Sequence, residues 1–134
     1  MLQKVNKKHG GFTLVELMVV VAIIALLASI AVSNFIRGRK RSQATLILED
    51  LRIIDSAIDQ YAIEGNRSSG ATVQWADIQK YLKTGSPIYN SGGNDLLGNA
   101  IGGFSVDSFP RLNSVTFNKL SDIAPSDFWS PFYP

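Results

Sequence analysis

The stretch GFTLVE, residues 11–16, stands directly before an uncharged apolar run, LMVVVAIIALLASIAV, residues 17–32. Residues 12–36 form a segment of roughly 25 residues, long enough as a helix to cross a hydrocarbon core of about 30 Å. Glu16 is the one carboxylate in that segment. A charged side chain in the middle of a membrane helix costs at least about 2.5 to 3.5 kcal/mol, so we expect Glu16 to have a function and a partner.

The residues before this stretch are polar and basic. Lys4, Lys7 and Lys8 lie within residues 1–11, which have the character of a targeting leader rather than of part of a fold. A secretory signal would be removed after its apolar region, but residues 28–31 are only a poor match to an A-x-A cleavage site. We therefore expect cleavage before the apolar run, not after it.

The basic leader, Gly11, Phe12, Thr13 and Glu16, followed by a long apolar stretch, resemble the amino-terminal signature of type IV pilins and type II secretion pseudopilins. The resemblance implies that a membrane prepilin peptidase cuts between Gly11 and Phe12. It also implies that the new amino terminus, Phe12, is methylated. Glu16 then becomes the fifth residue of the mature chain.

Cleavage would create an ammonium group that Glu16 could pair with. Pairing lowers the free energy of two opposite charges that would otherwise each be unpaired in hydrocarbon. Within one chain, Phe12 and Glu16 are one helical turn apart. The resemblance implies instead that Glu16 of one subunit meets the Phe12 amine of its neighbour and sets the axial register of assembly. The simpler alternative is an acid in the first helical turn that is favoured by the helix dipole.

Basic residues flank the apolar segment on both sides, so the charges alone do not fix its orientation. The leader favours an inside amino terminus, whereas the cluster of residues 37–41 favours the reverse. The resemblance implies cytoplasmic cleavage, a single-pass anchor in the inner membrane and a periplasmic carboxy-terminal head. The basic cluster would then contact lipid headgroups, contact another subunit or remain solvated.

Helical periodicity continues beyond the anchor. Most members of the family carry a proline near Ser33, and without one we expect an unbroken helix to about Glu64. Its second half is amphipathic, and Gly65 supplies the left-handed residue past its end. The apolar stripe of this half consists of Ile47, Leu51, Ile54, Ile58 and Tyr61. The predicted organisation is a leader at 1–11, an anchor at 12–36, an amphipathic extension at 37–65 and a head at 66–134.

The head is predicted to make the fold α+β and pilin-like, with short helices and a small antiparallel β-sheet packed on the long helix. Gly-rich turns suggest strands near residues 95–97, 100–101 and 104–106. A short helix capped by Ser114 follows. Trp75 is expected to anchor the core, with ligand stacking as the alternative. The aromatic tail at 128–134 is expected to pack back on the head, with a subunit contact as the alternative.

Composition excludes several classes of function. The only histidine, His9, lies in the leader and the chain has no cysteine, which removes Ser-His and Cys-His nucleophiles and the usual zinc ligands. We therefore predict no enzyme. From residue 42 onward six Lys and Arg face ten Asp and Glu, a formal charge of −4, which argues against a nucleic-acid-binding head. Many pilins close a carboxy-terminal loop with a disulfide, so the absence of cysteine favours a pseudopilin or a minor variant.

Calcium is the one cofactor for which the sequence offers candidate ligands. Residues 95–101, DLLGNAI, resemble the D-x-x-G-N-P-Y segment of major pseudopilins, some of which hold calcium, although Ala and Ile replace Pro and Tyr. Four carboxylates are candidate hard ligands: Asp95, Asp107, Asp122 and Asp127. No D-x-D-x-D-G spacing is present, and aspartates in turns commonly bond to local backbone amides instead.

The expected function is polymerisation into a helical filament, either a type II secretion pseudopilus or a type IV pilus, in the periplasm or outside the cell. The implied partners are copies of the same chain, other pilins or pseudopilins, prepilin peptidase, an inner-membrane assembly platform and membrane lipid. The alternative is a pilin-like, membrane-anchored minor subunit whose head binds a ligand or DNA.

Overall fold

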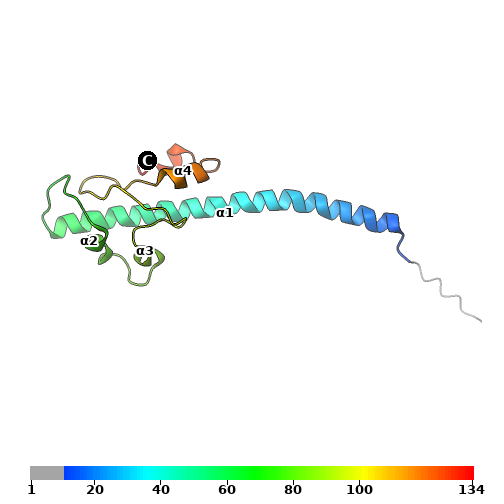
Figure 1. Cartoon of the computed structure of the whole chain (residues 1–134), viewed down its shortest axis with the longest axis horizontal. Coiled ribbons are helices and arrows are strands. Elements are labelled where there is room, and N and C mark those ends of the chain that lie inside the picture. The colour runs from blue at the N-terminus through cyan, green and yellow to red at the C-terminus, as the bar shows by residue number, and fades with distance from the viewer. Residues whose placement is uncertain (1–10) are drawn as a thin grey trace, which may run out of the picture. The chain divides into compact units, whose positions relative to one another are not determined.

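The computed structural model of the protein describes residues 11–134, so the predicted leader lies outside the described residues except for Gly11. The chain divides into two compact units, one that ends at Ile36 and one formed by Arg37–Pro134. Within the described residues the helices, labelled in Figure 1 where there is room, are α1 (Leu14–Glu64), α2 (Trp75–Gln79), α3 (Pro87–Asn90), α4 (Ser114–Leu120) and α5 (Ser126–Trp129).

Helix α1 is continuous over 51 residues, which confirms the unbroken helix predicted from the missing proline. Ser33 stands where the family usually has that proline, and its hydroxyl donates to the backbone oxygen of Ser29 at 3.2 Å. A serine bonded in this way is compatible with a helix interior, whereas a proline would remove a backbone donor and clash with the preceding turn.

The second half of α1 supplies one wall of the hydrophobic core. Its buried residues recur every three or four positions, as a helix with one apolar face requires, and they include the whole stripe predicted from the sequence. They are Ala44, Ile47, Leu48, Leu51, Ile54, Ala57, Ile58 and Tyr61.

The predicted end of α1 is confirmed, but the residue that terminates it is not the one expected. Asn66, with φ of 45°, occupies the left-handed position that the sequence assigned to Gly65. The amide of Asn66 donates to the oxygen of Ile63 and that of Arg67 to the oxygen of Ala62, the bond pair of a Schellman motif. The Arg67 guanidinium lies 4.3 Å from the ring centre of Tyr61, which packs the exit of the chain against α1.

Side chains from throughout the head complete the core against this stripe. The carboxy-terminal tail is part of it, as predicted: Trp129 and Phe132 are buried, and the Trp129 indole donates to the oxygen of Ala124 at 3.0 Å. The remaining buried apolar residues of the head are Val73, Ile78, Leu82, Ile88, Ile101, Val106, Leu112, Leu120 and Ala124.

Trp75 packs as a core residue rather than facing an open ligand site. Its ring contacts Phe104, with centroids 6.1 Å apart, and a Cβ at Gly93 would approach the ring to 3.3 Å. Gly93 also has φ of 90°, so glycine is required there for both conformation and space. The indole nitrogen of Trp75 is buried and has no hydrogen-bond partner within residues 11–134.

The predicted antiparallel sheet is not confirmed. Residues 11–134 contain only isolated antiparallel bridges, such as Asn94 with Ala100 and Gly102 with Arg111, and no run of paired residues long enough for a strand. The physical reason is the spacing of the glycines: Gly93, Gly98 and Gly103 all have positive φ and turn the chain every five residues. The head is therefore a set of short helices and bonded turns on α1.

One predicted strand, residues 95–97, is instead a turn organised by a buried carboxylate. The amides of Leu97 and Asn99 donate to Oδ1 of Asp95 at 2.9 and 3.0 Å. The hydroxyl of buried Thr116, on α4, donates to Oδ2 of Asp95, and the Asn99 side chain donates to the same hydroxyl at 2.8 Å. This network fastens the turn to α4.

Helix α4 lies where a short helix was predicted, but its cap is one residue earlier. The Asn113 side chain accepts from the amide of Val115 at 2.9 Å, so Asn113 is the N-cap and Ser114 the first helical residue. Both residue types are good caps, and the sequence alone does not choose between neighbours.

Asp95→Ala is expected to lower the free energy of unfolding by about 2 to 4 kcal/mol, because it leaves several partly or fully buried donors without an acceptor. Urea denaturation of the full chain in detergent, followed by tryptophan fluorescence, measures this change. Asp127→Ala, which removes an exposed acid, is the matched control and should shift stability by less than about 0.5 kcal/mol. Equal shifts for the two variants would contradict the network.

Candidate assembly site

The first half of α1 is covered by apolar side chains that have no partner within the described residues. The 51-residue helix contains a stretch with mean hydropathy 2.8, none of it buried, and by length and composition it can cross a membrane. Sixteen large apolar side chains between residues 12 and 36 are each more than half exposed. They are Phe12, Leu14, Val15, Leu17, Met18, Val19, Val20, Val21, Ile23, Ile24, Leu26, Leu27, Ile30, Val32, Phe35 and Ile36.

Glu16 lies in the first turn of this apolar helix and helps to begin it. The Thr13 hydroxyl accepts from the amide of Glu16 at 3.2 Å, and Oε2 of Glu16 accepts from the amide of Thr13 at 3.3 Å. This reciprocal pair is a capping box, which satisfies amides that a helix start leaves unbonded. The T-x-x-E spacing of residues 13–16 is the local sequence signal for this cap.

Gly11 and Phe12 precede the helix and are exposed; the Phe12 side chain is 90% exposed. Phe12, Thr13 and Glu16 are thus close together along the chain, with one carboxylate oxygen of Glu16 bonded to Thr13. Cleavage at Gly11 and pairing of Glu16 with an amine remain predictions of the sequence.

The basic residues that follow the apolar segment differ in their contacts. Lys40 donates to Oδ2 of Asp122 at 2.9 Å, a contact between residues 82 positions apart. That hydrogen bond lowers the pKa of the Asp122 carboxyl below its ordinary value. Arg37 and Arg41 are exposed and border a hollow beside Asp122. Lys40 therefore has an intrachain role that the sequence did not reveal, whereas the two arginines face outward.

An acidic hollow lies further along α1. Asp55 and Asp59, one helical turn apart, line it together with Asp107, Ser108 and Phe109. Burial raises the pKa of the Asp55 carboxyl, and repulsion by Asp59 raises it further. Asp107 has φ of 59°, a left-handed conformation in which non-glycine residues are uncommon.

The four calcium candidates do not assemble into a site. In residues 11–134 no group of three acidic or histidine side chains is close enough to hold a metal ion. Both oxygens of Asp95 already accept hydrogen bonds, and Asp122 is paired with Lys40. Asp127 lies in the first turn of α5 and Asp107 borders the acidic hollow. The arrangement does not fit a shared calcium ion, and calcium binding stays a prediction of the sequence.

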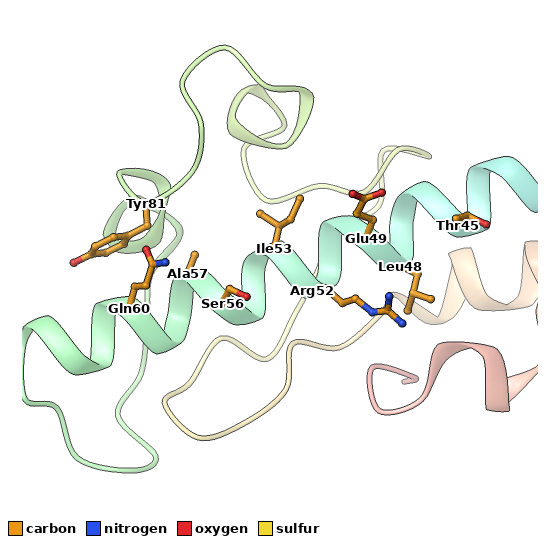
Figure 2. A pocket seen from close by; sticks show the side chains of 9 residues that line it. All are labelled: Thr45, Leu48, Glu49, Arg52, Ile53, Ser56, Ala57, Gln60 and Tyr81. Carbon is orange, nitrogen blue, oxygen red and sulfur yellow. The ribbon is translucent and has the colours of Figure 1, made fainter.

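An open groove of about 520 Å³ runs along the amphipathic half of α1. It is lined by Thr45, Leu48, Glu49, Arg52, Ile53, Ser56, Ala57, Gln60 and Tyr81 (Figure 2). Tyr81 lies just after α2, and its hydroxyl donates to Glu64, which together with burial raises the pKa of Tyr81. The lining mixes apolar with polar and charged side chains, as many protein contact surfaces do.

Comparison with known proteins agrees with the amino-terminal pattern. The family described as "Prokaryotic N-terminal methylation motif" matches residues 6–32. The type II secretion system core protein G of Aeromonas hydrophila is 31% identical over 91 residues, which cover 66% of this chain and 63% of the relative. The type IV major pilin protein PilA of Myxococcus xanthus is 40% identical over 68 residues, 51% of this chain and 31% of the relative.

The type IV major fimbrial protein FimA of Dichelobacter nodosus is 34% identical over 77 residues, 58% of this chain and 48% of the relative. The chain belongs to the type IV pilin and pseudopilin family. It spans less than two thirds of the length of each of these three pilin and pseudopilin relatives. No solved structure gave a significant match.

Within this pilin-family head, Asp55→Asn is expected to raise the melting temperature slightly at pH 7, by about 1 to 2 °C, because Asp55 is half-buried and solvent still screens part of the repulsion. The folded-state pKa of Asp55 is raised, so its ionised form opposes folding at pH values above that pKa. The difference should shrink as the pH falls through the folded pKa and vanish below the ordinary value of 3.8.

Near-ultraviolet circular dichroism of the full chain in detergent, which reports the packing of Trp129, measures both melting temperatures. An Asp55→Asn chain that melts lower than the parent at pH 7, or a difference that persists unchanged at pH 3, would contradict this assignment.

Proposed function

We propose that this chain is a structural subunit of a helical filament, either a type II secretion pseudopilus or a type IV pilus, and not an enzyme. The observation that carries the proposal is the bare apolar surface of residues 12–36. Burying sixteen large apolar side chains is worth on the order of 20 kcal/mol, far more than the margin by which a domain is stable. Such a surface needs lipid before assembly and other subunits afterwards.

The amino-terminal geometry supports processing before assembly. Gly11 and Phe12 are exposed ahead of the first helical turn, where a peptidase could reach the bond between them. Cleavage by prepilin peptidase and methylation would leave a charged amine at Phe12. Glu16 is exposed and lies within a turn of that amine in its own chain, and its second oxygen is not used by the capping box.

This function places the chain in the inner membrane as a single-pass protein, with its head in the periplasm until the filament forms. The partners are copies of the same chain, other pilins or pseudopilins, prepilin peptidase and an inner-membrane assembly platform. The relatives include a type II secretion protein and a type IV pilin, so the proposal covers both the pseudopilus and the pilus. The acidic head gives no support to a minor subunit that binds DNA.

Glu16→Ala is the variant that tests this function. It should be processed normally, so that mass spectrometry finds methylated Phe12 as the first residue, yet filament yield seen by electron microscopy should fall at least about tenfold, because a charge pair in a nonpolar setting is lost. Asp127→Ala, which removes an exposed acid of the head, is the control and should form filaments. Normal filaments from Glu16→Ala would overturn the pairing.

A further inference from the structure

The segment that follows α1 carries a sugar-acceptor pattern. Asn66-Arg67-Ser68 has the form N-x-S without a proline in the middle, which is the pattern at which asparagine is glycosylated in surface loops of secreted proteins. Among the asparagines of the sequence, Asn66 is the one that has Ser or Thr two residues later. Because the pattern is short, the surroundings of Asn66 decide whether an enzyme can use it.

The structure leaves this segment open. Residues 63–70, where the chain leaves α1 (Figure 1), are all exposed. The hydrogen bonds that shape the segment use its backbone: the amide of Asn66 donates to the oxygen of Ile63, and the oxygen of Ser68 accepts from the amide of Ala71 at 3.2 Å. The side-chain amide of Asn66 and the hydroxyl of Ser68 are therefore at the surface, where a transferase could reach them.

The long side chain inside the pattern, that of Arg67, packs back on α1. Its guanidinium lies 4.3 Å from the ring centre of Tyr61. A Cβ at Gly65 would come within 2.7 Å of Nε of Arg67, so the glycine leaves room for this packing. With Arg67 placed on the end of the helix, Asn66 stays exposed between its neighbours.

Termination of α1 accounts for Asn66 but not for Ser68. Asparagine is one of the residues that adopt positive φ at the end of a helix, and Asn66 has φ of 45°. The cap uses the backbone of Asn66 and leaves its side-chain amide unused by that motif. The hydroxyl of Ser68 has no part in the cap either. Ser68 is thus the residue that distinguishes a sugar-acceptor site from a helix cap alone.

We propose that Asn66 is an N-glycosylation site that receives an oligosaccharide from a polyisoprenyl pyrophosphate carrier. Nδ2 of Asn66 forms a bond to C1 of the first sugar, while the bond from C1 to the pyrophosphate oxygen breaks. The amide gives up one proton, and the lipid pyrophosphate leaves with the bonding electron pair. This inference rests on the proposed function, because that function places the head outside the cytoplasm, where secreted proteins carry such sugars.

Mass spectrometry of the full chain, purified from the cells that naturally produce it, tests the site. The proteolytic peptide that contains Asn66 should carry one or more sugar residues. Asn66→Gly should lose the whole added mass yet keep the turn, because glycine adopts positive φ readily. Ser68→Ala should lose the added mass as well, and Ser68→Thr should keep it, because the pattern accepts either hydroxyl.

Ser69→Ala is the matched control. It removes the neighbouring exposed hydroxyl, leaves the N-x-S pattern intact and should keep the added mass. If Asn66→Gly keeps the added mass while Ser68→Ala or Ser69→Ala loses it, the sugar is attached to a hydroxyl and the proposal is wrong. Loss of the added mass from Ser69→Ala alone would also contradict it.

The same preparation separates this proposal from the proposed function. A parent chain that forms filaments but carries no sugar at Asn66 would overturn the glycosylation site and leave the filament function intact. A parent chain that carries the sugar but forms no filaments would overturn the filament function and leave the site. A chain with neither would overturn both.

Discussion

The rest of the structure depends on the burial of apolar surface along α1. Within one copy of the chain, that surface is buried in only half of the helix. From Ala44 to Tyr61 the apolar face is covered by the head. Between residues 12 and 36 every large apolar side chain is bare. A water-soluble monomer would have to leave that second surface hydrated, which costs far more than a domain can tolerate. Membrane insertion and polymerisation are the two ways of covering it.

In the proposed filament, the Glu16 carboxylate would give this non-directional driving force its register. Apolar helices pack in many axial positions with similar energy, since the hydrophobic effect has no preferred direction. Glu16 is the one carboxylate among residues 12–36, so its position is a fixed mark on this apolar surface. In the basic cluster, Lys40 is paired with Asp122, and the arginines are exposed.

Features governed by local periodicity were predictable from the sequence. The buried stripe of α1 follows from residues three and four apart, and the continuous helix follows from the absence of proline before Arg37. The capping box of Thr13 and Glu16 was also readable, as its T-x-x-E spacing is local. The helix was predicted to end at about Glu64 and does end there, although Asn66 rather than Gly65 takes the left-handed conformation.

Features that depend on distant contacts were not predictable. Asp95 resembled a possible calcium ligand, but its carboxylate is used by Leu97, Asn99 and Thr116, and no local pattern reveals the last of these. Lys40 and Asp122 meet across 82 positions. The sheet was expected because glycines at short intervals suggested hairpins. Their positive φ angles instead prevent any pairing from continuing beyond a single bridge.

The central claim is that the bare half of α1 becomes covered by other copies, and chemical labelling measures this directly. In the cysteine-free chain, Val20→Cys places a thiol on the apolar half and Lys119→Cys places one on the exposed side of α4. In filaments washed free of lipid, a water-soluble maleimide should label Lys119→Cys and spare Val20→Cys. Equal labelling of the two positions would contradict the account.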